Sequence, residues 1–258
     1  MDRSIHSSAS TVRVETEGAL GIVTLNRPDK RNAISAEMIV AVGAAFADIR
    51  PEWKAVVIRA DGDNFSAGLD LSEHKERTPE AVLDISALWH RVTQSIADST
   101  IPVVCALKGY VVGAGLELAS AAHVRIADPN CRFCLPEGRR GIFVGGGASV
   151  RVGRLIGTSR LMELMLSGRE IDAQEGLAAG LFQRLAEPGG ACEQAMEYAR
   201  EVADNAPLSN RMILQALAQI AEMPARAGLF TESLAAALTQ TSPEAVQRIN
   251  AFFENQRR

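Results

Sequence analysis

The sequence predicts an α/β fold built on a β-sheet with helical crossovers. Three short apolar runs, at residues 54–60, 102–107 and 123–127, have the composition of buried strands. A glycine-containing turn and an amphipathic helix follow each of the first two runs. Strands that alternate with helices in this way are typical of βαβ units. Ligands in such folds bind beyond the carboxyl ends of the strands, where both glycine loops are expected.

The composition is that of a globular protein with a large core. The chain has 258 residues, of which 47% are hydrophobic and 22% charged, and this fits one large domain with a helical appendage. The net charge of −4, without any run of five like charges, argues against a nucleic-acid partner. Charges interrupt every apolar run before the roughly 18 to 20 residues that span a bilayer. We therefore expect no nucleic-acid binding and no membrane insertion.

The cysteines predict neither disulfides nor a metal site. The chain opens without an apolar signal core, so Cys105, Cys131, Cys134 and Cys192 are expected to be reduced in a cytoplasmic protein. Cys131 and Cys134 form one C-x-x-C pair. No second pair and no paired histidines complete four ligands, so we expect no metal ion.

The N-terminal part predicts a β-hairpin and a helix. Apolar and polar residues alternate at 11–15 and again at 21–25. A polar loop follows at 26–33, and Ser35 is the expected N-cap of a helix that ends before Pro51. The apolar positions of this helix are Met38, Ile39, Val42, Ala45, Phe46 and Ile49.

A second helix is expected at residues 81–97, between the turn-rich loop 61–71 and the strand at 102–107. Its apolar residues recur at helical spacing. They are Val82, Ile85, Leu88, Val92 and Ile96.

From Arg151 onward the pattern is helical. We expect helices near 161–166, 172–179, 192–204, 208–221, 227–238 and 243–253. Pro207 and Pro224 separate them, and the alanines at 235–237 suit close packing against another helix, including one of another subunit. The chain divides into a flexible N-terminus (1–10), an α/β core (11–200) and a helical C-terminal region (201–258).

Two loops of small residues and two glutamates point to proton chemistry beside a carbonyl group. If the loops at 67–70 and 113–115 each aim one backbone N–H at the same point, they form an oxyanion hole. A carbonyl polarised there acidifies its α-carbon, and Glu117 and Glu137 can then take and return protons.

Each piece also has a structural explanation. The glycines at 113 and 115 can form only a tight start to a helix, and Glu117 can be an ordinary acid in its first turn. Glu137 can be a surface residue. The joint arrangement favours function, because the neighbours of Glu117 are typical of a packed interior, where a carboxylate without a partner or a function is costly. Neither a complete dinucleotide-binding nor a phosphate-binding loop is present.

Four motifs in this order and spacing resemble the crotonase superfamily, that is, the enoyl-CoA hydratase/isomerase family. They are residues 26–33 (NRPDKRNA), 65–71 (FSAGLDL), 109–119 (GYVVGAGLELA) and 133–157. The resemblance extends from Val12 to about Glu254. It implies a crotonase-like α/β fold with a spiral (ββα)n core and a helical C-terminal region that assembles a homotrimer or a homohexamer. It also implies an acyl-CoA thioester substrate, with coenzyme A as part of the substrate and no separate cofactor.

The resemblance assigns roles to individual residues. Glu117 and Glu137 match the catalytic glutamates, with Glu117 activating water and Glu137 protonating the α-carbon. Leu69 and Ala114 match the oxyanion-hole amides. The implied substrate-binding residues are Arg27, Ala67, Gly68, Leu69, Asp70, Leu71, Ser72, Gly113, Gly145 and Phe252.

Some residues depart from the family pattern. Val144 replaces a usual proline, and Asn255 replaces a lysine that often pairs with a CoA phosphate. Arg139 and Arg140 follow Glu137 after one glycine, Gly138, and are expected to be solvated. The acyl group is expected to be limited by Trp89, His90 and Phe143.

These features favour an enoyl-CoA hydratase, because both glutamates are present. The alternative is a Δ3,Δ2-enoyl-CoA isomerase or other acyl-CoA enolate chemistry, such as decarboxylation or C–C cleavage, since one oxyanion hole serves all of these reactions. A third reading is a CoA-binding protein without catalysis or an RNA-binding member of the family, and the acidic balance argues against RNA.

Overall fold

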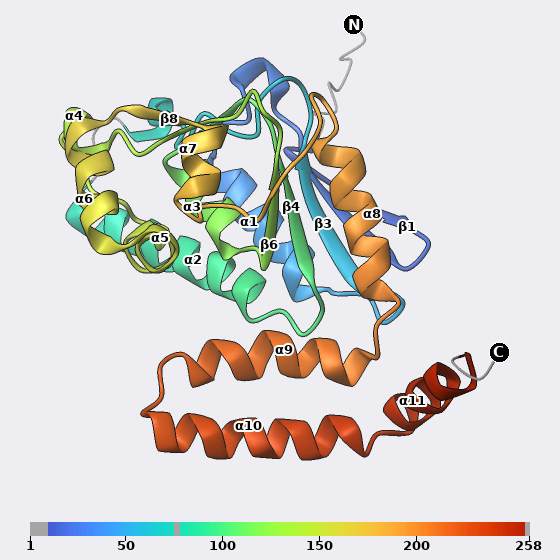
Figure 1. The fold of residues 1–258 in the computed structure, drawn as a ribbon. Coiled ribbons are helices and arrows are strands. Elements are labelled where there is room, and N and C mark those ends of the chain that lie inside the picture. The colour runs from blue at the N-terminus through green and yellow to red at the C-terminus, as the bar shows by residue number, and fades with distance from the viewer. Residues whose placement is uncertain (1–9, 75–77, 256–258) are drawn as a thin grey trace, which may run out of the picture.

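Figure 1 shows the computed structural model, which describes residues 10–74 and 78–255. Helices pack on both sides of a six-stranded sheet, and two long helices form a hairpin outside this core. The predicted flexible N-terminus, residues 1–10, lies outside the described residues except for Ser10.

The main sheet has the strand order β1-β2-β3-β4-β6-β9. Its strands are β1 (Val12–Glu17), β2 (Leu20–Leu25), β3 (Ala55–Ala60), β4 (Val103–Leu107), β6 (Val124–Ala127) and β9 (Arg184–Leu185). β1 and β2 form the predicted antiparallel hairpin, and every later pair is parallel. The expected βαβ sheet is thus confirmed, because β3, β4 and β6 lie on the three apolar runs.

Both faces of the central strands are apolar because each face packs against helices. On β3 and β4, Val57 and Val104 face α8 (Ala191–Ala203). Ile58 and Cys105 face the cluster that contains α1 (Ala36–Ala47), α2 (Pro79–Ala97) and α3 (Ala114–Ala121). Figure 1 shows α8 on one side of these strands and the other three helices on the opposite side. Alternate side chains of a strand point to opposite faces, so continuous apolar runs correspond to a sheet buried on both faces.

A second sheet of three short strands is not apparent from the sequence. β5 (Tyr110–Val112) pairs in parallel with β7 (Arg132–Cys134), and β7 pairs antiparallel with β8 (Glu170–Asp172). Segments of three residues carry too little periodicity to predict a strand. β5 leads directly into the glycine loop at Gly113, so this sheet fixes one side of the candidate site.

The helices agree with the expected positions, with two additions. They are α1 (Ala36–Ala47), α2 (Pro79–Ala97), α3 (Ala114–Ala121), α4 (Glu137–Arg140), α5 (Ala148–Ile156), α6 (Thr158–Ser167), α7 (Ala173–Ala178), α8, α9 (Pro207–Ile220), α10 (Ala225–Gln240) and α11 (Pro243–Asn255), with 3₁₀ turns at Pro28–Lys30 and Leu71–His74. Ser35 caps α1 as predicted, because its side chain accepts a hydrogen bond from Met38 N. The helical region begins earlier than predicted, since α4 lies before Arg151 and α5 begins at Ala148.

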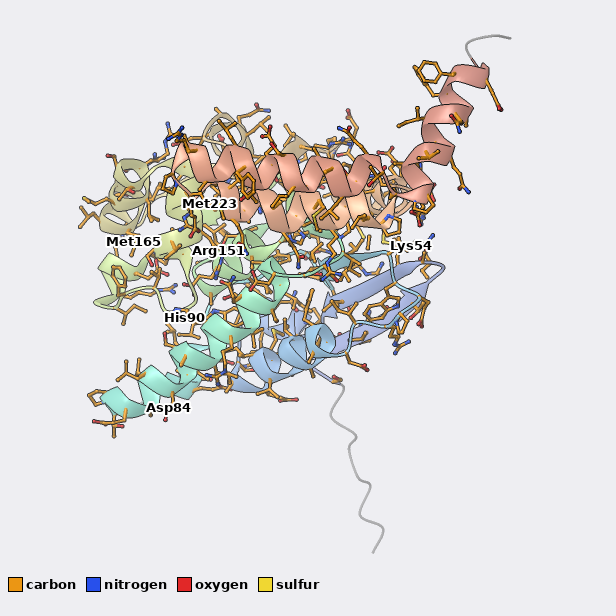
Figure 2. All side chains as sticks on the ribbon, turned by 90° about the horizontal axis from the view of Figure 1, so that it is seen from below. Lys54, Asp84, His90, Arg151, Met165 and Met223 are labelled. Carbon is orange, nitrogen blue, oxygen red and sulfur yellow. The ribbon has the colours of Figure 1, made fainter. Side chains whose placement is uncertain are left out.

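The C-terminal helices stand apart from the core. α9 and α10 run antiparallel below the sheet, and α11 leads away from them (Figure 1). Met223, labelled in Figure 2, lies in the turn between α9 and α10. An ion pair of 2.8 Å between Arg154 and Glu222 joins α5 to this turn. Among the described residues, no helix combines the length and apolarity that crossing a membrane requires.

Candidate active site

The loop after β3 lies directly against β5 and the start of α3. Ser66 and Val111 form a parallel bridge, and Val112 N donates to Ser66 O at 3.0 Å. Gly68 has φ +91°, and a Cβ there would lie 2.9 Å from Val112 O. Glycine is therefore required for the close approach of the two backbones.

The two predicted oxyanion-hole amides are available to a ligand. Leu69 follows Gly68 in this loop, and Ala114 is the first residue of α3. Within the described part of the chain, neither N–H donates to a protein acceptor. Gly113 precedes Ala114 with φ +47°, and a Cβ there would meet Glu137 Oε1 at 3.0 Å. The glycine thus sets the direction of the Ala114 N–H and lets a carboxylate approach it.

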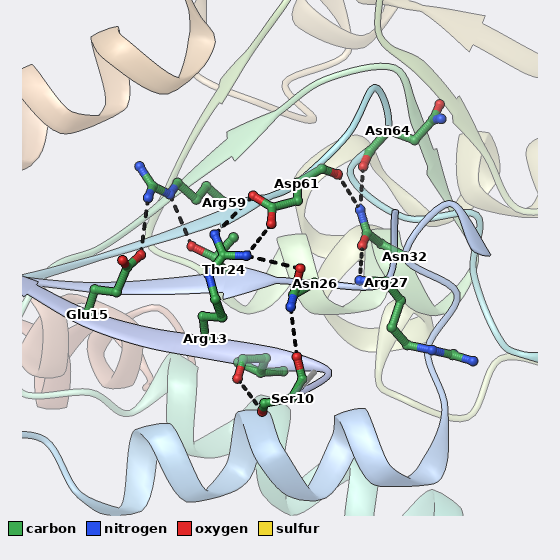
Figure 3. A network of polar contacts seen from close by, with 11 residues as sticks. Ser10, Arg13, Glu15, Thr24, Asn26, Arg27, Asn32, Arg59, Asp61 and Asn64 are labelled. Carbon is green, nitrogen blue, oxygen red and sulfur yellow. Dashed lines mark hydrogen bonds and ion pairs between the residues drawn. The ribbon is translucent and has the colours of Figure 1, made fainter. Parts of the chain in front are cut away.

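Asn32 anchors the start of the loop that follows β3. The sequence does not identify Asn32 as a site residue. Its buried side chain donates to Asp61 O and Asn64 O at 2.8 Å each and accepts from Arg27 N at 2.8 Å. Figure 3 shows these contacts together. Ser66 Oγ donates to Asn32 O at 2.7 Å. The first motif, residues 26–33, and the loop after β3, residues 61–71, are therefore joined by hydrogen bonds.

The predicted substrate-binding residues Arg27, Asp70 and Ser72 bind one another. Arg27 Nη2 lies 2.9 Å from Asp70 Oδ2, while Ser72 donates to Asp70 Oδ1 through its N–H at 3.1 Å and its hydroxyl at 2.6 Å. The Ser72 hydroxyl, together with Arg27, holds the pKa of Asp70 below its usual value. These hydrogen bonds fix the turn that follows Leu69. Leu71, between Asp70 and Ser72, exposes its side chain.

Glu117 is buried, and its burial is compensated by hydrogen bonds. It lies in the first turn of α3 and is 4% exposed. Oε1 accepts from Gly146 N at 2.6 Å and from Ala148 N at 3.3 Å, and Oε2 accepts from Trp89 Nε1 at 3.2 Å. Three donors supply the partners that a buried carboxylate requires.

Gly145, which the resemblance implies as a substrate-binding residue, precedes Gly146 in this segment but does not bind the carboxylate of Glu117. Gly145 O accepts from Ser86 Oγ at 2.7 Å, and its N–H meets no acceptor among the described residues. The N–H that reaches Glu117 is that of Gly146. Sequence reasoning missed Gly146 and also Arg151, which donates to Gly146 O.

Glu137 differs from Glu117 because one of its carboxyl oxygens has no hydrogen-bond partner in the described structure. It begins α4, is 6% exposed, and its Oε2 is buried without a hydrogen-bond partner in the described structure. Burial, assisted by the nearby charge of Glu117, raises the pKa of Glu137 to about 7. Arg139 and Arg140 are exposed, as expected from the sequence. Glu137 can therefore hold or release a proton near neutral pH, which suits a general acid or base.

In the described chain, some of the predicted site residues do not lie near Glu117 and Glu137. Phe252 lies on α11, 58% exposed and packed edge-to-face against Phe253, and Figure 1 shows α11 away from α3 and α4. Of the residues expected to limit the acyl group, Trp89 is buried, whereas Phe143 is 72% exposed and His90 lies on the exposed side of α2 (Figure 2). The contact of Phe252 with coenzyme A stays a prediction.

Comparisons with known proteins relate the chain to one family of enzymes. Residues 15–257 match the family model described as enoyl-CoA hydratase/isomerase. The chain is 30% identical to the short-chain-enoyl-CoA hydratase of Clostridium acetobutylicum, over 96% of each chain. It is 33% identical to the 2,3-dehydroadipyl-CoA hydratase of Escherichia coli K12, over 90% of this chain and 91% of that one. A crystal structure from Rhodopseudomonas palustris, assigned as an enoyl-CoA hydratase, superposes with a TM-score of 0.93 at 48% identity and 96% coverage of both chains. The chain therefore belongs to the enoyl-CoA hydratase/isomerase family of enzymes and has their crotonase-like fold.

Proposed function

We propose that this protein adds water across the double bond of a 2-enoyl-CoA thioester. The observation that carries the proposal is the pair of buried glutamates beside two unpaired amides. Glu117 accepts three hydrogen bonds, whereas Glu137 has a pKa raised to about 7 by burial. Two carboxyl groups in different environments suit the two proton movements of hydration.

The reaction begins with polarisation of the thioester. Its carbonyl oxygen accepts hydrogen bonds from the N–H groups of Leu69 and Ala114, which stabilise the negative charge that develops on that oxygen. Glu117 accepts a proton from water as the water oxygen bonds to the β-carbon. The electron pair of the double bond moves toward the α-carbon and the thioester oxygen, giving an enolate.

Protonation completes the addition. Glu137 donates its proton to the α-carbon of the enolate, and the carbonyl double bond re-forms as the product leaves. The proton held by Glu117 returns through solvent to restore Glu137, so the net change is the addition of one water molecule. Coenzyme A is carried by the substrate, and the proposed steps use no further cofactor.

We expect the purified protein to consume a 2-enoyl-CoA such as crotonyl-CoA and to form a 3-hydroxyacyl-CoA. In heavy-oxygen water, hydration places one labelled oxygen atom on the β-carbon, and mass spectrometry of the product detects it. The matched substrate is the 3-enoyl isomer, which an isomerase converts to the 2-enoyl form without label. Turnover of 3-enoyl-CoA with no labelled product from any 2-enoyl-CoA would assign isomerisation instead.

We also propose that the protein forms a homotrimer or a homohexamer through its C-terminal region. On α10, Phe230, Leu234 and Leu238 recur every four residues and are 51–66% exposed, which makes one continuous apolar stripe. Light scattering should give three or six times the chain mass of 27.6 kDa. The mass of a single chain at micromolar concentration would contradict this assembly.

A further inference from the structure

One face of the α2 helix lies against Glu117 and the backbone of Gly145 and Gly146. Ser86, Trp89 and Thr93 are spaced three and four residues apart, so they share one face of the helix. Ser86 Oγ donates to Gly145 O at 2.7 Å, and the Thr93 hydroxyl shares its O–H between Gly146 O at 3.1 Å and Trp89 O at 2.9 Å. The outer two of these residues thus hold the backbone on either side of the Gly145–Gly146 peptide bond.

Trp89, between Ser86 and Thr93 on this face, holds the catalytic carboxylate itself. Its Nε1–H donates to Glu117 Oε2 at 3.2 Å. The other oxygen, Oε1, is occupied by the N–H groups of Gly146 and Ala148. A carboxylate oxygen accepts hydrogen bonds along two lone-pair directions, so Oε2 keeps one acceptor position. The orientation of this position depends on the indole.

The indole is locked in place by packing. Trp89 is 4% exposed, and a Cβ on Gly146 would lie 2.0 Å from both Cδ1 and Nε1 of its ring. The ring therefore lies directly on the glycine backbone. From the other side, Arg151 on α5 donates to the same Gly146 carbonyl. The indole N–H of Trp89, which binds Oε2, and the N–H of Gly146, which binds Oε1, are therefore held by the same packed residues.

We propose that Trp89 is the positioning residue of the water-adding half of the reaction. Its N–H fixes the Glu117 carboxylate so that the remaining Oε2 position receives the proton of the attacking water. No hydrogen bond joins Glu137 to Trp89 in the described structure, so transfer of a proton at the α-carbon does not depend on the indole N–H. The inference rests on the proposed hydratase function, and it separates two steps that can be measured independently.

The test compares Trp89→Phe with the wild-type protein in two assays. The first is hydration of crotonyl-CoA. The second is exchange of the α-hydrogen of butanoyl-CoA in deuterated water, in which Glu137 removes a proton, the oxyanion hole holds the enolate, and a deuteron returns to carbon. Phenylalanine keeps an aromatic ring but lacks the donor. We expect kcat for hydration to fall about 10- to 100-fold, as for loss of a hydrogen bond to a charged group, with KM within about twofold. We expect exchange to stay within about threefold of wild type.

Trp53→Phe is the matched control. Trp53 is also buried, at 3% exposure, and its Nε1 donates to Thr16 Oγ1 at 3.0 Å, in a region that the proposed reaction does not use. Both assays should stay within about twofold of wild type in this variant. In the Trp53→Phe background, benzothienylalanine at position 89 replaces the N–H by sulfur while keeping the ring shape, and it should reproduce the selective loss of hydration without lowering the melting temperature.

The outcomes distinguish the two proposals. If both changes at Trp89 leave hydration unchanged in an active enzyme, the positioning role is overturned and the hydratase function stands. If hydration and exchange fall equally, the indole supports the site only as packing, which also overturns the positioning role. If the wild-type protein exchanges the α-hydrogen but hydrates no enoyl-CoA, the hydratase proposal fails, and the role of Trp89 fails with it.

Discussion

Glu137→Gln is expected to lower the hydration rate about 10²- to 10⁴-fold, the range typical of losing a general acid. Glutamine keeps the shape of the side chain but cannot deliver a proton. In the native protein, burial raises the pKa of Glu137 to about 7, so the group exchanges protons readily at neutral pH. The measurement is kcat for crotonyl-CoA, and exchange of the α-hydrogen should be lost in parallel.

Glu170→Gln is the matched control for this variant. Glu170 is exposed on β8, and the proposed reaction does not use it. The control should keep wild-type rates in both assays. A Glu137→Gln protein that retains more than about a tenth of wild-type hydration would contradict the assigned role.

The same substitution should change how stability depends on pH. Because burial raises the pKa of Glu137 from 4.5 to about 7, the folded protein binds a proton more tightly than the unfolded chain between these values. The free energy of unfolding therefore falls as pH rises from about 4.5 to about 7, by about 3 kcal/mol, and this contribution is constant above that range. Glutamine does not titrate. Urea unfolding should show that the variant gains stability relative to wild type between about pH 4 and about pH 8.

Gly146→Ala is expected to affect both stability and activity strongly. A Cβ there would lie 2.0 Å from the Trp89 ring and 2.5 Å from Glu117 Oε2. Neither neighbour can yield easily, because the ring is buried and the carboxylate is held by three donors. Overpacking of this kind costs about 1 to 3 kcal/mol. Displacement of the carboxylate should also lower kcat for hydration by at least about tenfold.

Gly145→Ala is the matched control for stability. A Cβ on Gly145 would meet Ser86 Oγ at 3.5 Å, an ordinary van der Waals contact. Neither residue has a positive φ, so the two substitutions differ mainly in the space available. Urea unfolding should place Gly145→Ala within about 0.5 kcal/mol of wild type. Equal destabilisation of both variants would show that the contact with Trp89 does not decide the effect.

Much of the fold follows from local sequence patterns. The hairpin, the three apolar strands and the capped helix α1 have signals of their own, namely alternation, β-branched runs and an N-cap serine. The second sheet has none, because each of its strands spans only three residues and gains its hydrogen bonds from segments distant in the chain. Its strand β5 nevertheless carries the loop that ends at Ala114.

The candidate site, like the fold, could be predicted from the sequence only in part. The sequence alone provides the glycine loops and the two glutamates, and the spacing of its motifs predicts the family. It does not predict that Asn32 ties the first motif to the loop after β3, since that bond joins residues about thirty positions apart. Phe252 is recognisable in the sequence, but the structure of the chain does not bring it to the glutamates.

The difference between the two glutamates is decided only by tertiary structure. In the sequence, Glu117 and Glu137 are both acids beside small residues. In the folded protein, Glu117 meets the indole of Trp89 and the amides of Gly146 and Ala148, whereas Glu137 is buried with one oxygen unpaired. Hydrogen bonds favour the ionised form of a carboxyl group and burial without them favours the protonated form. The sequence thus supplies the two glutamates, and packing from α2 and α5 determines that their carboxyl groups lie in different environments.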